Sequence, residues 1–321
     1  MKKRIIITLS TVVVAMSLLS GCNKSANEQV TIRMIASDGI AQAPLFLISE
    51  FNIIKKYADN AKVDFKAINS GSVINEAFIA NQVDIAAFGF SNFAIGFDKG
   101  IPYKIASAVS YGRFGLQTNN PNIKTLRDVG TDDRVALPSL TGINGILFYM
   151  ACEKEFGTHK ALEDNIIAMD GEVAELALIN RSSGISLHMD NLGVILRENL
   201  AGCPTILDSA DILGGTGAGV VSVATIDFVN KHPDLYDAYL LSLEDAVSLI
   251  NNRDEQAIEF LTKTFNMSQE DILESLDNGS LYYSTSDYNI LPISDFLYRA
   301  EMISNKIDSL RDVSFPNVVA E

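Results

Sequence analysis

The chain has 321 residues and a formal net charge of −15, with 47% hydrophobic and 20% charged residues. This balance excludes a disordered chain, because there is enough apolar surface to build a large core. The acidity also excludes a nucleic-acid partner, because phosphate backbones would repel the protein. A chain of this length predicts two compact lobes.

The N-terminus has the layout of a secretory signal. Lys2, Lys3 and Arg4 precede an apolar run over 5–19, which is shorter than the roughly 20 residues that span a bilayer comfortably. The sequence "LLSGC" at 18–22 then resembles a bacterial lipobox. That resemblance implies cleavage before Cys22 and lipid attachment to this cysteine, and the alternative is an uncleaved anchor helix. We expect a signal peptide over 1–21, a tether over 22–29, and a lipid anchor on the extracytoplasmic face of the cell membrane.

The first half of the chain alternates strand and helix patterns. Such a rhythm, with about 20 residues per unit, predicts an α/β fold with mostly parallel sheets covered by helices on both faces. The predicted strands are 30–37, 62–68, 83–89 and 103–109, and the predicted helices are 43–57, 72–82 and 91–100.

The rhythm resumes after residue 118 and gives way to a helical tail after a last strand at 220–225. The strands expected in this second part are 134–139, 165–170, 185–189 and 204–209. The helices expected are 141–157, 172–181, 191–202, 226–231, 234–251, 254–265, 269–277 and 290–307. We therefore predict lobe one over 30–112, lobe two over 113–216, and a return to lobe one with C-terminal helices over 217–321.

Several patterns that would signal an enzyme or a metal site are missing or weak. The sequence "GGTGAG" at 214–219 precedes a strand, whereas a dinucleotide loop precedes a helix, so we favour a flexible crossover. The three histidines are far apart in sequence, and no nucleophile–base set occurs, so we expect no metal, no cofactor and no catalytic residue. Cys152 and Cys203 fit either a disulfide or two buried thiols, and we favour the thiols.

Polar residues follow the predicted strands where helices begin. Ligands of open α/β sheets bind beyond the carboxyl ends of the strands, and helix N-termini present unpaired N–H groups there. Each residue alone fits simple helix capping, but the recurrence favours a binding cleft for a small anionic or polar solute. The candidates are Gln42, Ser70, Gly71, Ser72, Gly89, Ser91, Asn92, Ser139, Thr141 and Gly142.

Three further residues are candidates for the same cleft. Arg113 lies at the first crossing between lobes, where it would clamp an anion or neutralise nearby acids. His188 and Asp190 lie at a strand end, where they would bind a ligand or form a surface pair near a hinge.

The order of several segments resembles one known family. These segments are "QAPLFLISEFNIIKKY", "VDFKAINSGS", "ANQVDIAAFGFSNF", "IPYKIASAV", "NIKTLRDVGTDDRVALPS" and "HPDLYDAYLLSLEDAVSLINNRDEQAIEFL". They are similar to the substrate-binding proteins of ABC importers for nitrate, aliphatic sulfonates, taurine and thiamine pyrimidine precursors.

The resemblance implies the type II periplasmic-binding-protein fold, in which two α/β lobes close on a ligand. It places the cleft at Gln42 and at 70–72, 89–92, 139–142 and 188–190. It also implies a monomer that delivers its ligand to a permease and its ATPase. The alternatives are an enzyme on the same fold, akin to pyrimidine synthases or menaquinone-pathway enzymes, and a ligand-sensing lipoprotein.

Overall fold

The computed structural model describes residues 29–68, 70–182, 184–215, 218–286, 288 and 290–318. The predicted signal peptide and Cys22 lie outside these residues. Every described helix and strand lies within 30–318, so the chain from Asn23 onward contains all of them. Within the described part of the chain, no helix combines the length and the apolar character needed to cross a bilayer.

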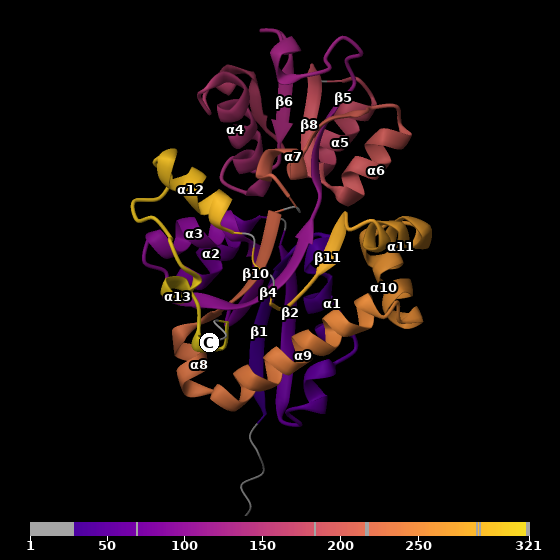
Figure 1. Cartoon of the computed structure of the whole chain (residues 1–321). Helices are drawn as coiled ribbons and strands as arrows, with labels where there is room; N and C mark the ends of the chain where they lie inside the picture. The colour runs from indigo at the N-terminus through magenta and orange to yellow at the C-terminus, as the bar shows by residue number, and fades with distance from the viewer. Residues whose placement is uncertain are drawn as a thin grey trace, which may run out of the picture.

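A six-stranded sheet with helices on both faces forms the lower half of the molecule in Figure 1. Its strands, in spatial order, are β11 (Leu281–Tyr283), β4 (Tyr103–Gly112), β10 (Ala218–Thr225), β3 (Ile85–Gly89), β1 (Val30–Ser37) and β2 (Ala61–Ile68). Successive strand residues face opposite sides, so Ala86 and Phe88 join one apolar cluster while Ile85 and Ala87 join another. One face is therefore packed against α2 (Gly71–Ile79) and α3 (Phe90–Asp98), and the other against α1 (Ala43–Glu50) and α9 (Pro233–Asn251).

A five-stranded sheet forms the upper half. Its order is β7 (Ile166–Ala168), β6 (Arg134–Leu137), β8 (Ile185–Asn191), β5 (Phe114–Thr118) and β9 (Thr205–Asp208). Its helices are α4 (Ile143–Phe156), α5 (Gly171–Ile179), α6 (Leu192–Leu200) and α7 (Ser209–Leu213). We call the six-stranded sheet with its helices lobe one, and the five-stranded sheet with its helices lobe two.

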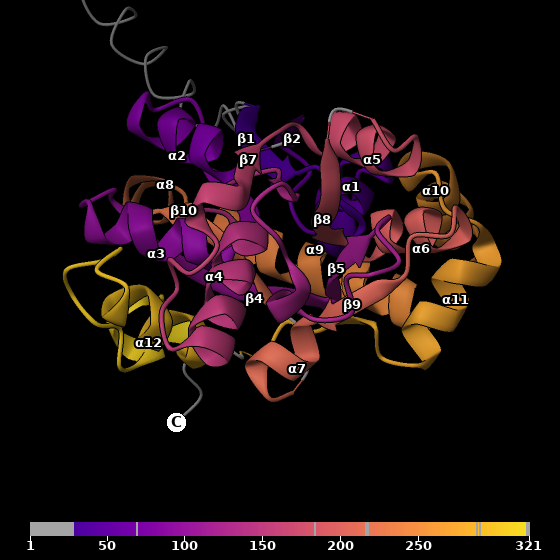
Figure 2. The same cartoon turned by 90° about the horizontal axis from the view of Figure 1, so that it is seen from above.

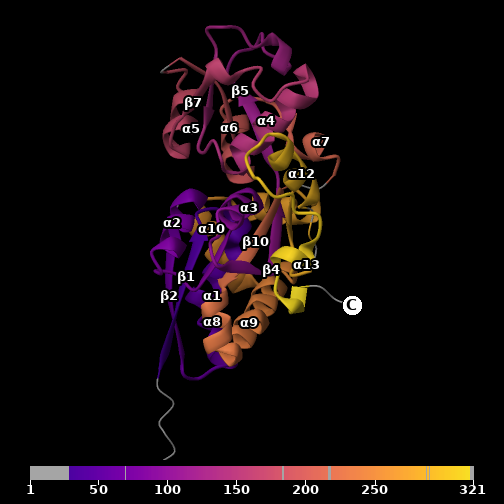
Figure 3. The same ribbon diagram turned by 90° about the vertical axis from the view of Figure 1, so that its left-hand side faces the viewer.

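The chain returns to lobe one through β10 and ends in helices. These are α8 (Ile226–Lys231), α9, α10 (Glu255–Phe265), α11 (Gln269–Asp277), α12 (Leu291–Arg299) and α13 (Leu310–Val313). The two-lobed α/β architecture is confirmed, as the side view in Figure 3 shows. The lobe boundaries after residues 112 and 216 stay a proposal.

The strand pairing differs from the mostly parallel arrangement that the β–α rhythm predicts. Pairs β1–β2, β1–β3, β6–β7 and β6–β8 are parallel, but the five pairs made by β10, β11 and β5 are antiparallel. The reason is tertiary: β10 returns from lobe two and inserts between β3 and β4. The alternation of strands and helices along the chain carries no information about this insertion.

Two predicted helices are shorter than expected. The helix predicted for 43–57 stops at Glu50 and resumes as a 3-10 turn at Ile53–Lys56, because Asn52 adopts a left-handed backbone with φ of 51°. The helix predicted for 290–307 stops at Arg299, and Glu301 has φ of 57°. Asparagine adopts this backbone readily, so Asn52 is a usable signal, whereas glutamate is a good helix former and Glu301 gives none.

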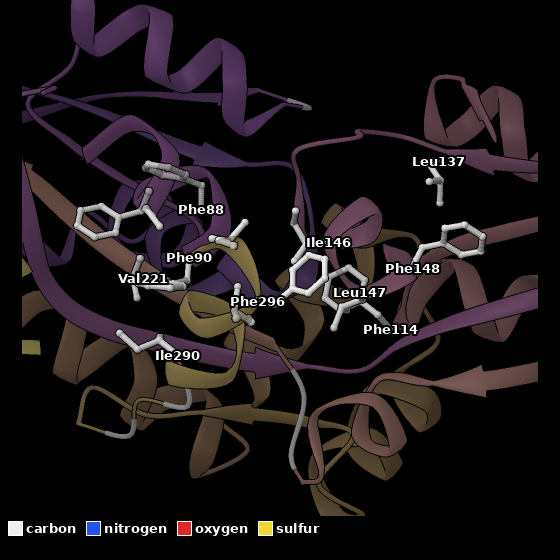
Figure 4. Close-up of a cluster of buried hydrophobic side chains, with 14 of the residues drawn as sticks. Phe88, Phe90, Phe114, Leu137, Ile146, Leu147, Phe148, Val221, Ile290 and Phe296 are labelled. Carbon is white, nitrogen blue, oxygen red and sulfur yellow. The ribbon is translucent and has the colours of Figure 1, made fainter. Parts of the chain in front are cut away.

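Helix α12 joins the two lobes through apolar side chains. It contacts α3 of lobe one and α4 of lobe two. Phe296 on α12 is fully buried in a cluster that runs from Phe88 and Phe90 in lobe one to Phe148 in lobe two (Figure 4). Arg299 also pairs with Glu153 on α4 at 2.8 Å. The lobes are thus held together on the α3–α4–α12 side, and Figure 2 shows these three helices gathered there.

The contacts of α12 with both lobes predict a large loss of stability when its buried side chain is shortened. Phe296→Ala removes a fully buried ring, so it should lower the free energy of unfolding by about 3–5 kcal/mol in urea denaturation. Tyr298→Ala on the same helix, where the side chain is 46% exposed, is the matched control and should cost about 1 kcal/mol or less. Equal effects of the two substitutions would contradict the proposal that Phe296 holds the lobes together.

Candidate functional site

A cavity of about 570 Å³ lies between the lobes. Lobe one contributes the carboxyl ends of β1 and β3 and the starts of α1, α2 and α3, and lobe two contributes the starts of α4, α5 and α6. The turn between α10 and α11 closes one side, where Asn266 and Met267 line the cavity. A volume of this size accommodates a small organic molecule.

Four helices begin at this cavity without a side-chain cap. The N-cap residues of α1, α2, α3 and α4 are Gln42, Ser70, Gly89 and Gly142, and none of them makes a side-chain cap hydrogen bond. Side-chain caps are present at α5, α6, α10 and α11, whereas α9 and α12 also begin without one. The uncapped N–H groups and the positive ends of these helix dipoles therefore face the cavity, where a ligand with acceptor atoms would satisfy them.

The side-chain amide of Asn92 lies where three of these helices meet. A Cβ added at Gly71 would lie 2.3 Å from Asn92 Nδ2, and one added at Gly142 would lie 3.7 Å from the same atom. The backbone carbonyl of Asn92 accepts a hydrogen bond from Asn75 Nδ2 at 2.8 Å, which holds the residue in place. Glycine at 71 thus permits the close approach of α2 to Asn92, and the amide is available to a ligand.

Ser139 shapes the start of α4. Its Oγ accepts a hydrogen bond from the backbone N–H of Gly142 at 2.9 Å. The hydroxyl proton remains free to donate to an acceptor in the cavity.

Asp190 supplies a carboxylate at the lobe-two wall. Its Oδ1 accepts from Asn191 N at 2.7 Å, from Asn191 Nδ2 at 2.8 Å and from Asn144 Nδ2 at 3.3 Å. Its Oδ2 lies 3.4 Å from His188 Nε2, outside good hydrogen-bond geometry. These contacts fix the carboxylate in one orientation at the edge of the cavity.

His188 is fully buried behind Asp190 and is enclosed by carboxylates. Its Nδ1 lies 2.7 Å from Glu198 Oε1, and both side chains are inaccessible to solvent. Burial lowers the pKa of His188, but the interactions with Asp190 and Glu198 outweigh it and raise this pKa to about 9. Burial raises the pKa of Glu198, because a carboxyl group away from water favours its neutral form. The pair therefore retains its proton through neutral pH.

Two arginines at the cavity are already paired. Arg197 donates two hydrogen bonds, of 2.7 and 2.8 Å, to the Glu175 carboxylate. Arg113, where the chain first passes between the lobes, forms an ion pair with Asp208, which lies shortly before the chain returns to lobe one. The charged lining residues are four acids and two arginines, with a formal net charge of −2: Asp38, Glu172, Glu175, Asp190, Arg113 and Arg197. The lining charge therefore does not favour a purely anionic solute, although the helix N-termini do.

Most residues predicted from the sequence line this cavity. They are Gln42, Ser70, Gly71, Gly89, Asn92, Arg113, Ser139, Gly142 and Asp190. The structure brings them together from both lobes, as the strand-end argument predicts.

Four predicted residues do not line it. Ser72 is exposed and its hydroxyl lies 2.7 Å from that of Ser70, while Thr141 points to solvent. Ser91 and His188 are fully buried instead. Ser72 and Ser91 lie in the first turn of a helix, where residues one position apart point about 100° apart, so only some of them face the cavity. His188 lies on β8 and is buried against Glu198.

The sequence reasoning missed several lining residues. Glu175 and Arg197 lie in the middle of α5 and the end of α6, and no strand-end signal identifies them. Asn144 lies two residues beyond the predicted cleft segment 139–142. Asn266 and Met267 follow α10, more than 70 residues away from the lobe-two candidates, so only the fold brings them to the cavity.

The described part of the chain has no cluster of metal-ligating side chains and no cysteine at the cavity. Within it, no group of three or more histidine, cysteine, aspartate or glutamate side chains could hold a metal ion. Cys152 and Cys203 are both free and buried, and neither lines the cavity. Burial raises the pKa of the Cys152 thiol to about 12.

Comparison with known proteins identifies relatives by structure alone. No family model and no curated protein matches the sequence. The chain is similar in fold to the periplasmic aliphatic sulphonate binding protein SsuA from Escherichia coli, with 17% identity, a TM-score of 0.69, and 89% of this chain and 92% of that chain covered. It is also similar to the alkanesulfonate-binding protein SsuA from Xanthomonas axonopodis pv. citri bound to MOPS, with 12% identity, a TM-score of 0.74, and 90% and 99% covered.

A third similar structure is the periplasmic nitrate-binding protein NrtA from Synechocystis PCC 6803. It has 15% identity and a TM-score of 0.68, with 88% of this chain and 84% of that chain covered. Identities this low show the fold only. The type II periplasmic-binding-protein fold implied by the sequence resemblance is confirmed.

The buried His188 predicts a specific dependence of stability on pH. Its pKa is raised from 6.5 to about 9, so the stabilisation by the imidazolium is complete below pH 6.5 and is lost as the pH rises through about 9. The groups that face the ring are Asp190 on its own strand and Glu198 on α6, with Arg197 adjacent. In thermal unfolding, the difference between wild type and His188→Gln should be largest near pH 6 and should shrink toward pH 9. A difference that is constant over this range would contradict a protonated His188.

Proposed function

We propose that the chain is the solute-binding component of an ABC importer, which captures a small solute between its two lobes. The observation that carries the proposal is the cavity between the lobes, onto which four uncapped helix N-termini open. The similar structures support it, since their names describe sulfonate and nitrate binding proteins. Contacts from both lobes would favour a closed state once the ligand is bound.

The proposed ligand is a small anionic or polar organic solute. The classes in question are sulfonates, nitrate-like anions and pyrimidine-like molecules. The uncapped N–H groups, the Asn92 amide and the Ser139 hydroxyl are donors that suit oxygen acceptors of any of these. The proposed ligand-binding residues are therefore Gln42, Ser70, Gly71, Gly89, Asn92, Arg113, Ser139, Gly142 and Asp190.

We propose a binding protein rather than an enzyme. The histidine nearest to the cavity, His188, has no exposed surface, and the two thiols lie elsewhere. A general base must come within hydrogen-bond reach of a substrate proton, and His188 is separated from the cavity by Asp190. The buried imidazole is better explained as a support for the Asp190 carboxylate.

We further propose export and lipid anchoring through Cys22, with a membrane permease and its cytoplasmic ATPase as partners. This part of the proposal rests on the basic start, the apolar run and "LLSGC". An anchor at the N-terminus would leave both lobes free to close on a solute and to reach the permease. A sensing role at a membrane receptor is the competing function, and loss of solute uptake in a deletion strain would argue against it.

The solute-binding proposal predicts ligand stabilisation that depends on Asn92. In a thermal-shift screen of residues 23–321 with sulfonates, nitrate, carboxylates and pyrimidines, a ligand at 100 times its Kd should stabilise the fold by about 2.7 kcal/mol. Asn92→Ala should weaken binding of that ligand roughly tenfold, because a buried polar contact is lost. Asn252→Ala, at the end of α9, is the matched control and should bind as the wild type does. No stabilisation by any class would count against a solute receptor.

The anchoring proposal predicts that one cysteine decides where the protein resides. Full-length Cys22→Ala should incorporate no labelled fatty acid and should leave the membrane fraction, because no thiol remains at the lipobox. Cys203→Ala removes a buried thiol and should behave as the wild type. Lipid labelling that survives Cys22→Ala would refute the assignment.

A further inference from the structure

A polar network outside the cavity links the starts of α2 and α3. Asn75 on α2 donates from Nδ2 to the backbone carbonyl of Asn92 at 2.8 Å, and its Oδ1 accepts from Tyr103 Oη at 3.0 Å. The same hydroxyl lies 3.1 Å from the carbonyl oxygen of Phe93, so its one proton is shared between two acceptors. Burial raises the pKa of Tyr103, so the hydroxyl stays protonated and remains a donor.

Aromatic side chains surround the hydroxyl end of this network. Tyr103 is fully buried, and its ring centroid lies 4.8 Å from that of Phe78 and 5.2 Å from that of Phe93. A polar group without a partner is costly in such a setting, so each member of the network depends on the others. The Asn75 amide is therefore held in one orientation, with Nδ2 toward α3 and Oδ1 toward β4.

A glycine inside α3 makes room for the network. A Cβ added at Gly96 would lie 2.0 Å from Tyr103 Oη and 2.9 Å from both polar atoms of the Asn75 amide. The φ of Gly96 is not positive, so the backbone does not require glycine here. Glycine inside a helix is less favourable than alanine. The absence of a side chain at this position is therefore explained by the space that the network occupies.

The network ends at a cavity residue whose side chain has no partner. Asn92 is 6% exposed and lines the cavity, and its side-chain amide forms no hydrogen bond with any residue that the structure describes. Its Nδ2 also lies close to α2, 2.3 Å from the Cβ that a side chain at Gly71 would add. The amide is thus left for a ligand, while its place is set by contacts outside the cavity.

We infer that Asn75, held by Tyr103, is a positioning residue for ligand binding, which fixes the Asn92 amide and the free N–H groups of α2 and α3 relative to one another. The inference rests on the proposed function and deepens it. Neither Asn75 nor Tyr103 lines the cavity, so both act through Asn92. Donors that are fixed before the ligand arrives lose less entropy on binding, so displacing the network weakens binding without removing a ligand contact.

The position of the Asn92 amide can be followed without a ligand. In isotope-labelled protein of residues 23–321, the NMR signal of this side-chain amide is identified by its absence from the spectrum of Asn92→Ala. Asn75→Ala and Tyr103→Phe should each shift or broaden the signal, because the Asn92 backbone loses a contact or its support. Tyr239→Phe is the matched control and should leave the signal unchanged. Tyr239 is also fully buried, but its hydroxyl lies 2.6 Å from Ser222 Oγ in the other apolar cluster of lobe one.

The same variants separate positioning from stability in a binding experiment. Affinity for nitrate, ethanesulfonate, propanoate and methylpyrimidine is measured by calorimetry, and the probe that binds the wild type most tightly is kept. Asn75→Ala should weaken its binding roughly tenfold, and Tyr103→Phe about fivefold. Tyr239→Phe should lower the thermal midpoint about as much as Tyr103→Phe does, since each loses one buried hydroxyl, but it should keep the wild-type Kd.

Gly96→Ala displaces the network without removing any of its members. The added methyl group competes with the Tyr103 hydroxyl for space, so this variant should weaken binding roughly tenfold. In Tyr103→Phe that hydroxyl is already missing. The double variant Gly96→Ala/Tyr103→Phe should therefore bind within about twofold of Gly96→Ala alone. Multiplied effects of the two substitutions would contradict a shared network.

Each outcome decides the question. A wild-type signal in Asn75→Ala, or wild-type affinity with a shifted signal, overturns the inference and leaves the solute-binding function standing. Equal loss of affinity in Tyr239→Phe overturns it too, because the effect would then be one of general stability. Binding of no probe to the wild type counts against the proposed function, and the Asn92 signal then decides the inference. Tyr103→Phe keeps the ring and carries the test when another variant fails to fold.

Discussion

Backbone N–H groups at the first turn of a helix need acceptors, and this molecule directs four such turns at one cavity without capping them. Gln42, Ser70, Gly89 and Gly142 all occupy N-cap positions, yet their side chains leave the donors free. At other helix starts, Asp254 and Ser268 cap α10 and α11, whereas α9 and α12 begin without a side-chain cap. The strands β1, β3 and β6 make this possible, because each ends at the cavity and is followed by a helix that begins there.

The two walls of the cavity differ in chemistry. Lobe one offers the starts of α1, α2 and α3 and the amide of Asn92, whereas lobe two adds the carboxylates of Asp190 and Glu175 to the start of α4. The lobe-two carboxylates are held by partly buried partners: Asp190 by Asn191 and Asn144, Glu175 by Arg197. Fixed groups lose little entropy when a ligand arrives, so such walls are suited to selecting a ligand by the position of its polar atoms.

Movement between the lobes is limited by the apolar cluster around α12. Phe296 is buried between Phe88 and Phe90 on one side and Phe148 on the other, and His159 lies against its ring at a centroid distance of 6.0 Å. Separating these surfaces would expose apolar area at a cost of about 25 cal/mol per Å². Any opening of the cavity is therefore expected to leave this side together, with the opposite side, at α5, α6 and the α10–α11 turn, moving apart.

The sequence by itself determined the local elements and the donor wall of the candidate site. Alternating apolar residues predicted the strands, and helix starts after strand ends pointed to residues such as Ser70, Asn92 and Gly142, because these signals depend only on near neighbours in the chain. Local patterns also predicted two α/β blocks and a helical tail.

Only the tertiary structure decided the pairing, the second wall and the role of His188. Strand β10 inserts between β3 and β4, and β5 pairs antiparallel with β8, because the chain crosses twice between the lobes. The same crossings bring Met267 next to Gly193, whereas the packing of α5 against α6 pairs Arg197 with Glu175. His188 lies two residues before an aspartate in the sequence, but its burial against Glu198 follows from how α6 packs on β8. Contacts between residues distant in the chain depend on packing, and no short sequence pattern records them.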